Sequence, residues 1–215
     1  MNIFAVSGWA LPAEWFREQV REYFPSAQVK CFYPRNPFVR DEAVRELNTH
    51  RADLYIGYSM GSLWLMKYRD LLPPDSVKAL LAPILAFLKE RDMGGKTGET
   101  QLKYFIKILK RNSRNKNSAL LDFYSSCDFP FSRALIEDIP DAETLIRGLE
   151  FLATESVSEE ACCTFKAITG EKDIFLDAKR LKNLIPHLEV VDSAGHSPSL
   201  LLERLASLVP PGYRL

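Results

Sequence analysis

The stretch of sequence that decides the fold is residues 53–69, DLYIGYSMGSLWLMKYR. Its first part, Asp53–Tyr58, is a short apolar run rich in residues that favour β-strands. Its second part, Ser59–Arg69, has the composition of a helix, and only a tight turn separates the two. A buried strand that passes directly into a helix is typical of an α/β fold with a mainly parallel sheet.

The same alternation continues on both sides of this stretch. Short apolar runs predict strands, and apolar residues spaced three and four apart predict helices. The predicted strands are Ile3–Ser7, Val29–Tyr33, Asp53–Tyr58, Ser76–Pro83, Cys163–Thr169 and Leu188–Asp192. The predicted helices are Leu11–Phe24, Glu42–Asn48, Ser59–Arg69, Asp177–Ile185 and Pro198–Leu208. We therefore expect about six strands in one mainly parallel sheet that is flanked by helices.

The alternation breaks between about Leu88 and Ala161, where the pattern is helical and contains no convincing strand. We interpret this stretch as an insertion over one end of the sheet. The predicted division is an α/β core of residues 1–88 and 161–215 with a helical lid insertion of residues 89–160. A chain of 215 residues has the length of one domain with such an insertion.

The charge of this insertion is split between its two halves. Residues 89–116 carry nine basic and three acidic side chains, and residues 117–160 carry two basic and ten acidic ones. On the helix predicted from Gln101 to Arg111, apolar residues form one face and basic residues follow a second stripe. The apolar face is Leu102, Phe105, Ile106 and Leu109, and the stripe is Lys103, Lys107, Lys110 and Arg114. The stripe either docks an acidic partner or pairs with the acidic half of the insertion.

The composition argues against several other classes of protein. Lys+Arg and Asp+Glu both number 28, so no global positive field for nucleic acid exists. No run approaches the roughly 18 apolar residues of a membrane span. Four Cys and three His are too few for a disulfide scaffold or a zinc array, so we expect reduced thiols and no metal. The expected reduced thiols and an N-terminus that lacks the pattern of a signal peptide together predict a cytoplasmic protein.

The pentapeptide Gly57-Tyr58-Ser59-Met60-Gly61 fits the pattern G-x-S-x-G in full. In this pattern the serine stands on a sharp, strained turn between strand and helix, and its Oγ projects above the sheet. The two glycines leave room for the neighbouring backbone. The helix that follows directs its first N–H groups toward developing negative charge, so Ser59 is a candidate nucleophile.

A serine nucleophile needs a general base, and the base needs an acid that orients it. His196 follows the strand predicted at Leu188–Asp192, and Asp173 follows the strand predicted at Cys163–Thr169. Both therefore belong to the carboxyl edge of the sheet, where open α/β sheets bind ligands. The order Ser, Asp, His along the chain also fits this arrangement.

Other residues compete for these two roles. His50 and His187 each precede a strand, which places them at the opposite edge. Asp177 is a plausible helix N-cap, and Asp192 ends a strand, so both remain alternatives to Asp173.

Two backbone N–H groups are candidates for an oxyanion hole. One belongs to Met60, which follows the nucleophile. The other belongs to Trp9, where Gly8 lets the backbone approach closely. The indole of Trp9 can also simply pack in the core or form a wall of the pocket.

Together these motifs resemble those of the α/β-hydrolase superfamily. Within it, residues 8–15 (GWALPAEW), 57–61 (GYSMG) and 194–198 (AGHSP) resemble the pimeloyl-acyl-carrier-protein methyl ester esterases of biotin synthesis. In those enzymes a His usually precedes Gly-Trp, whereas this chain has Ser7. The change removes one polar support of the oxyanion loop but keeps the backbone donor.

The resemblance implies a serine carboxylesterase that needs no metal or organic cofactor. Its triad would be Ser59, Asp173 and His196, and its substrate a small acyl ester, the pimeloyl methyl ester, carried by an acidic acyl carrier protein. The lid aromatic residue Phe123 would line the acyl channel. Carrier docking would use Lys103, Lys107, Lys110, Arg111 and Arg114. The alternatives are a thioesterase or general short-chain esterase of the same fold, and a non-catalytic binding protein.

Overall fold

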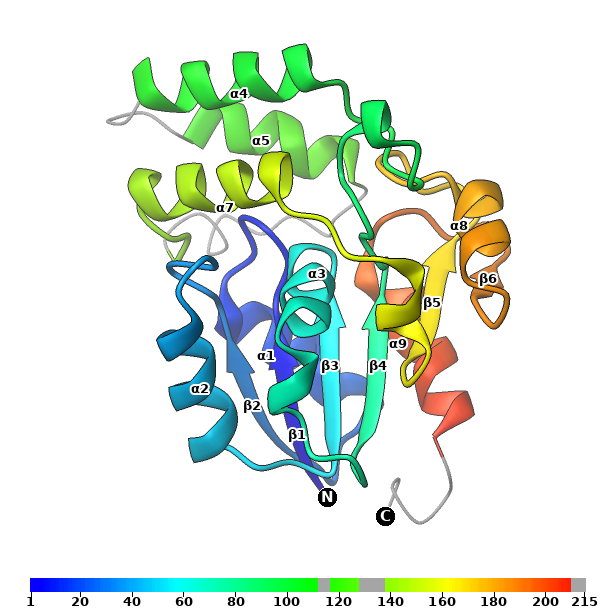
Figure 1. Cartoon of the computed structure of the whole chain (residues 1–215). Coiled ribbons are helices and arrows are strands. Elements are labelled where there is room, and N and C mark those ends of the chain that lie inside the picture. The colour runs from blue at the N-terminus through cyan, green and yellow to red at the C-terminus, as the bar shows by residue number, and fades with distance from the viewer. Residues whose placement is uncertain (112–116, 128–137, 210–215) are drawn as a thin grey trace.

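A single six-stranded parallel sheet forms the centre of the molecule (Figure 1). The computed structural model describes residues 1–111, 117–127 and 138–209. The strand order is β2-β1-β3-β4-β5-β6. The strands are β1 (Asn2–Val6), β2 (Gln28–Phe32), β3 (Leu54–Tyr58), β4 (Val77–Leu81), β5 (Lys166–Gly170) and β6 (Glu189–Val191).

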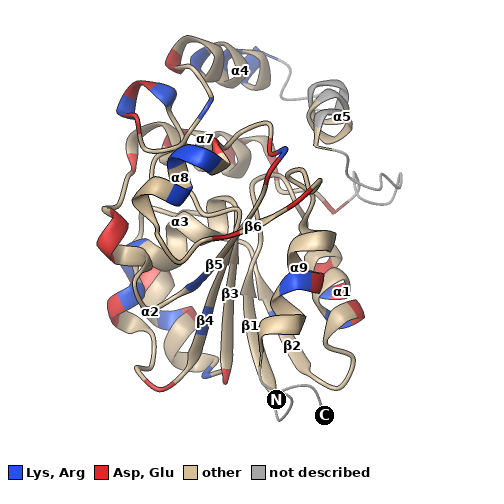
Figure 2. Cartoon of the chain, turned by 90° about the vertical axis from the view of Figure 1, so that its right-hand side faces the viewer, with Lys and Arg blue, Asp and Glu red and all other residues tan. Residues whose placement is uncertain are grey.

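Helices cover both faces of the sheet. α1 (Ala13–Tyr23) and α9 (Pro198–Leu208) pack on one face, and α2 (Arg40–Thr49) and α3 (Met60–Lys67) lie on the other (Figure 2). α8 (Ala178–Leu184) precedes β6. Because the sheet is covered on both faces, all five residues of the central strand β3 are buried. This explains why β3 is continuously apolar rather than alternating.

The predicted strands and helices of the core are confirmed, with shifts at their ends. Two shifts have a clear cause. The strand predicted to end at Pro83 stops at Leu81, because Ala82 has a left-handed φ of 49°. The strand predicted from Cys163 begins only at Lys166, since Cys163 belongs to a turn that follows a short helix. In that turn the Cys163 N–H donates to the Glu160 carbonyl over 3.2 Å.

Three helices, which we call the cap helices, lie over the carboxyl ends of the strands (Figure 1). They are α4 (Glu99–Arg111), α5 (Asn117–Ser126) and α7 (Ala142–Thr154). The described residues also contain three short 3₁₀ helices, which are η1 (Arg69–Leu71), η2 (Lys89–Arg91) and η3 (Glu159–Cys162). The described part of residues 89–160 contains no strand, as the sequence predicts. No described helix combines the length and apolar character of a membrane span.

The packing of α4 confirms its predicted amphipathic character. Leu102 and Leu109 are buried and Phe105 and Ile106 are partly buried, whereas Lys103 is exposed on another face. The loops that follow β1, β3, β5 and β6 all meet beneath the cap helices, because the strands are parallel. The N-terminus lies at the opposite edge of the sheet (Figure 1).

Candidate active site

Ser59 stands on the turn between β3 and α3 in a conformation that few residues other than glycine adopt. Its φ is 52° and its ψ is −117°. A Cβ on Gly57 would lie 2.7 Å from the Gly61 carbonyl oxygen, and one on Gly61 would lie 2.3 Å from the Val6 carbonyl oxygen. Both glycines of the motif are therefore required by close backbone contacts, as the pattern predicts.

A second serine, Ser62, stabilises this turn, although sequence reasoning did not find it. Its buried hydroxyl donates to the Ser59 carbonyl over 2.6 Å and accepts from the Ile84 N–H over 3.0 Å. The hydroxyl thus ties the turn to the chain that follows β4. The signal in the sequence is the position of Ser62, three residues after Ser59, the N-cap of α3. A serine at this spacing can hydrogen-bond back to the backbone.

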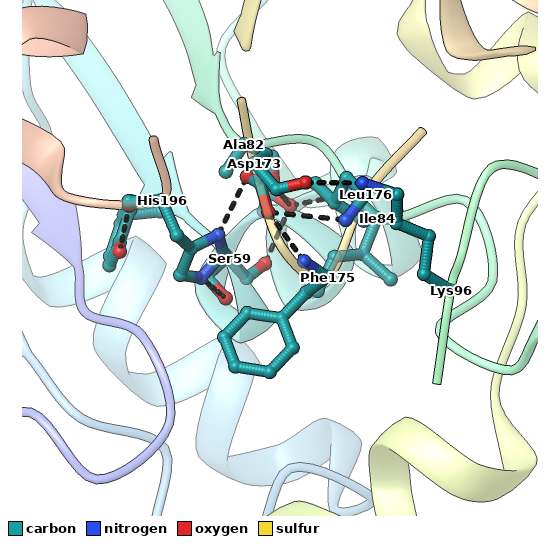
Figure 3. A network of polar contacts seen from close by, with 10 residues as sticks. Ser59, Ala82, Ile84, Lys96, Asp173, Phe175, Leu176 and His196 are labelled. Atoms are coloured by element: carbon teal, nitrogen blue, oxygen red, sulfur yellow. Dashed lines mark hydrogen bonds and ion pairs between the residues drawn. The ribbon is translucent and has the colours of Figure 1, made fainter. Parts of the chain in front are cut away.

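The structure brings Ser59, His196 and Asp173 together in a hydrogen-bonded chain (Figure 3). His196 Nε2 lies 3.0 Å from Ser59 Oγ, and His196 Nδ1 lies 2.7 Å from Asp173 Oδ2. All three side chains are buried, and Ser59 is only 7% exposed. This is the geometry of a nucleophile, a base and an orienting acid.

Both carboxyl oxygens of Asp173 have hydrogen-bond partners. Its second oxygen, Oδ1, accepts from the backbone N–H groups of Phe175 over 2.8 Å and Leu176 over 3.1 Å. Lys96 Nζ donates to the Asp173 backbone carbonyl over 2.5 Å, a contact that sequence reasoning also missed (Figure 3). When His196 Nδ1 carries the ring proton and donates it to Asp173 Oδ2, Nε2 is free to accept from the Ser59 hydroxyl.

The competing residues lie elsewhere. Asp177 accepts from the Arg180 N–H and caps α8, and Asp192 is exposed. His50 contacts the Glu46 carbonyl, and His187 contacts the Cys162 and Phe165 carbonyls before β5.

Tyr58 and Phe175 hold His196 from two further sides. The Tyr58 hydroxyl donates to the His196 carbonyl over 2.6 Å. Burial raises the pKa of Tyr58 well above its ordinary value, so this hydroxyl keeps its proton. The Phe175 ring stands edge-on to the imidazole, with centroids 4.9 Å apart. The loop that carries His196 is also tied to the loop after β5, where the Lys172 N–H donates to the Ala194 carbonyl over 2.8 Å.

The loop after β1 approaches the serine closely. A Cβ on Gly8 would lie 3.2 Å from Ser59 Cβ and 2.8 Å from the Tyr58 ring. Among the described residues, the backbone N–H groups of Trp9 and Met60 donate to no acceptor. Met60 is the first residue of α3, where the first amides lack a partner within the helix. Both predicted oxyanion donors are therefore available for a ligand.

Ser7 gives this loop a polar support of its own. The buried Ser7 hydroxyl donates to the Leu11 carbonyl over 3.0 Å. The serine thus bridges the two ends of the turn at the position where the resembling enzymes usually have a histidine.

A cavity of about 600 Å³ lies between the sheet edge and the cap helices, and Ser59 and His196 form part of its wall. Most of its lining is apolar. α4 contributes Leu102, Phe105 and Ile108, and α7 contributes Leu149 and Leu152. Phe123 on α5, which the resemblance implies in an acyl channel, is among the lining residues too. A cavity of this size and character suits an apolar acyl group.

The basic residues predicted to dock a carrier divide into two groups. Lys103 pairs with Glu99 over 2.7 Å, and Lys110 pairs with Glu150 on α7 over 3.3 Å. Lys107 and Arg111 are exposed and form no ion pair within the described residues. In the stripe, Lys110 therefore pairs with the acidic half of the insertion and Lys103 pairs within α4, whereas Lys107 has no ion pair in the part of the chain that the structure describes. Arg114 lies outside the described residues. No cluster of His, Cys, Asp or Glu among the described side chains could hold a metal ion.

Comparison with known proteins identifies the fold but no family. No family model and no curated protein matches the sequence. Solved structures do match the fold. The N-acyl homoserine lactonase AidH has a TM-score of 0.64 at 13% identity, over 96% of this chain and 86% of that one. A thermophilic esterase from Thermogutta terrifontis has a TM-score of 0.65 at 15% identity, over 97% of this chain and 87% of that one.

The chain has the α/β-hydrolase fold. This fold also matches that of the bottromycin epimerase BotH, with a TM-score of 0.64 at 14% identity over 97% of this chain and 90% of that one. An α/β-hydrolase fold therefore accommodates more than one reaction, and function has to be argued from the site.

Proposed function

We propose that this protein is a serine hydrolase that cleaves the carboxylic ester of an apolar acyl group. The observation that carries the proposal is the hydrogen-bonded chain from Ser59 Oγ through His196 to Asp173 beside an apolar cavity. The free N–H groups of Trp9 and Met60 and the likeness of the fold to a lactonase and an esterase support it.

In the acylation step, Ser59 Oγ attacks the ester carbonyl carbon while His196 Nε2 takes the hydroxyl proton. The carbonyl π electrons move to oxygen, and the N–H groups of Trp9 and Met60 bind the resulting oxyanion. When the tetrahedral intermediate collapses, the C–O bond to the alcohol breaks and His196 returns its proton to that oxygen.

In the second step, water attacks the acyl-enzyme and gives its proton to His196, and collapse releases the carboxylic acid and restores Ser59. Asp173 fixes the His196 tautomer and stabilises the imidazolium in both steps. No proton or electron pair has to come from a cofactor.

The test is hydrolysis of p-nitrophenyl esters by the wild type, Ser59→Ala and the control Ser26→Ala, whose serine is exposed in the turn after α1. We expect kcat to fall more than about 1,000-fold in Ser59→Ala, since loss of a triad member removes most of the catalysis, and to stay unchanged in the control. A fluorophosphonate should label Ser59 alone. Hydrolysis that survives Ser59→Ala would overturn the proposal, and a wild type that neither turns over nor labels would favour the non-catalytic binding protein.

We further propose that the substrate is the methyl ester of a pimeloyl group on acyl carrier protein. The three motifs that resemble the biotin-pathway esterases support this substrate, and so does α4. Its inner face lines the cavity with Leu102 and Phe105, and the same helix carries the exposed bases Lys107 and Arg111. An acidic carrier bound there would hold its acyl arm beside the cavity.

This proposal treats residues 89–160 as a lid on a core of residues 1–88 and 161–215. It also places the enzyme in the cytoplasm, where acyl carrier protein would meet it.

The second test compares kcat/KM for three substrates: the carrier-bound methyl ester, a free methyl ester and an acyl thioester. The variant is Lys103→Glu/Lys107→Glu/Arg111→Glu. The control is Lys30→Glu/Arg51→Glu/Lys166→Glu, which reverses three exposed charges outside the cap helices. We expect kcat/KM to fall about 10-fold in the first variant alone, and only for the carrier-bound ester. This loss should become smaller as the salt concentration rises. Preference for the thioester would indicate a thioesterase, and turnover of simple esters alone a general short-chain esterase.

A further inference from the structure

Two adjacent residues of α5, Phe123 and Tyr124, contact opposite sides of the site. Tyr124 is buried, and its hydroxyl donates to the Ala10 carbonyl in the loop after β1. The Phe123 ring lies 4.9 Å from the Trp9 ring and 5.7 Å from the Phe175 ring. One helix of the cap therefore reaches both the oxyanion loop and the aromatic residue that packs on His196.

A second cap helix holds the same loop. The Trp9 indole Nε1–H donates to the Leu145 carbonyl of α7 over 2.8 Å. Gly148 of α7 packs directly against the indole. A Cβ at this position would lie 2.8 Å from Trp9 Cδ1. The side chain of Trp9 is thus held by α7, and the Ala10–Leu11 peptide is held by α5.

The loop needs such support because Ala10 has a left-handed φ of 60°. A non-glycine residue keeps this conformation only where surrounding contacts favour it. Among the described residues, the Ala10 N–H has one long contact of 3.5 Å, to the Tyr33 hydroxyl. The bond from Tyr124 to the Ala10 carbonyl is the shorter of these two polar contacts.

We propose that Tyr124 is a positioning residue of the oxyanion hole: its hydroxyl holds the Ala10 carbonyl and thereby directs the Trp9 N–H toward the substrate oxygen. This inference rests on the proposed hydrolase function. It implies that the oxyanion hole is complete only when α5 is docked on the loop, so the cap contributes to the chemical step as well as to substrate binding.

The test is Tyr124→Phe, which removes one oxygen atom and keeps the ring. The control is Tyr68→Phe, because the buried Tyr68 hydroxyl also donates to a backbone carbonyl, that of Pro37 over 3.0 Å, but does not line the cavity. Its kcat should stay unchanged. With a p-nitrophenyl ester, we expect kcat of Tyr124→Phe to fall about 10- to 100-fold and KM to change less than twofold. Complete loss of one oxyanion donor lowers kcat by about 100- to 1,000-fold, and a donor that is present but misdirected should cost less. The affinity for a trifluoromethyl ketone, which mimics the tetrahedral oxyanion, should fall by the same factor as kcat/KM.

Rates are divided by the number of active sites that a fluorophosphonate labels to completion, so a less stable variant is judged on its folded molecules alone. An unchanged kcat per site, or a rise in KM with kcat unchanged, would overturn the inference while wild-type turnover through Ser59 still supports the hydrolase. A wild type without turnover or labelling would overturn both proposals.

Discussion

Ser59 illustrates how neighbouring residues maintain a strained conformation. Its positive φ costs on the order of 1–3 kcal/mol for a residue with a Cβ. Two hydrogen bonds offset this cost: the Ser59 N–H donates to the Leu81 carbonyl over 2.9 Å, and its carbonyl accepts from the Ser62 hydroxyl over 2.6 Å. The turn is therefore held from β4 and from α3, and Ser59 Oγ stays within reach of His196.

The close contacts of Gly61 predict a large effect of one methyl group. In Gly61→Ala, the new Cβ would lie 2.3 Å from the Val6 carbonyl oxygen, a backbone atom that cannot move alone. We expect the free energy of unfolding to fall by about 2–3 kcal/mol, the upper range for overpacking, with loss of esterase activity. Urea unfolding followed by circular dichroism measures the first effect.

The matched control for this prediction is Gly98→Ala. There the nearest atom to a new Cβ is Lys89 Cε at 3.2 Å, in a flexible side chain. Its unfolding free energy should change by less than about 0.5 kcal/mol. Equal losses in the two variants would show that the contact of Gly61 with β1 is not what destabilises the protein.

At the scale of elements, the cap helices are part of the site rather than a cover above it. α4 and α7 line the cavity, α5 contacts the loop after β1 through Tyr124, and α7 contacts Trp9 directly. Gly148 is the position where this contact is closest. A glycine inside a helix is unfavourable by about 1 kcal/mol relative to alanine, so its presence in α7 indicates a packing requirement.

Gly148→Ala should therefore separate activity from stability. Alanine favours the helix, but its Cβ would lie 2.8 Å from Trp9 Cδ1 and 3.1 Å from Met60 Sδ. The methionine can adapt, whereas the indole must shift away from Leu145. We expect kcat/KM to fall about 10-fold while the melting temperature changes by only a few degrees. Thr154→Ala, at the exposed end of α7, is the control and should leave kcat/KM unchanged; a similar loss there would contradict a role for the contact with Trp9.

At the scale of the whole molecule, several acidic hydroxyl and thiol groups are buried without charge. Burial raises the pKa values of Tyr33, Tyr58 and Tyr124 above their ordinary range. It also raises the pKa of Cys162 to about 12 and that of Tyr68 to about 12. Each of these groups keeps its proton in the folded protein at a pH where the unfolded chain has lost it.

This difference predicts alkaline unfolding. Above about pH 10 the unfolded chain binds fewer protons than the folded one, so the free energy of unfolding decreases as pH rises. Each such group contributes a slope of about 1.4 kcal/mol per pH unit above its unfolded pKa, and none of the tyrosines contributes below about pH 9. Urea unfolding between pH 8 and 11 measures the slope. Tyr33→Phe should make it less steep; an unchanged slope would mean that Tyr33 is ionised in the folded protein as well.

Much of this protein could be predicted from local patterns in the sequence. Apolar spacing predicts the core strands and helices, because burial of a strand or of one helix face requires a fixed period. G-x-S-x-G places Ser59 on a strained turn, and parallel strands place the loops of Asp173 and His196 at the same edge. The structure brings these three residues together within hydrogen-bond distance. Their catalytic roles, the carrier partner and the biotin-pathway substrate stay predictions.

Only the tertiary structure decided the contacts between segments that lie far apart in the chain. Tyr124 contacts Ala10 across 114 residues, Lys96 contacts Asp173 across 77, and Trp9 contacts Leu145 across 136. The pairing of Lys110 with Glu150, which takes one base out of the predicted docking stripe, is of the same kind. Local spacing determines which face of a helix or strand is buried. Which side chains meet at the sheet edge depends on how the cap helices dock on it, and no short-range pattern encodes that docking.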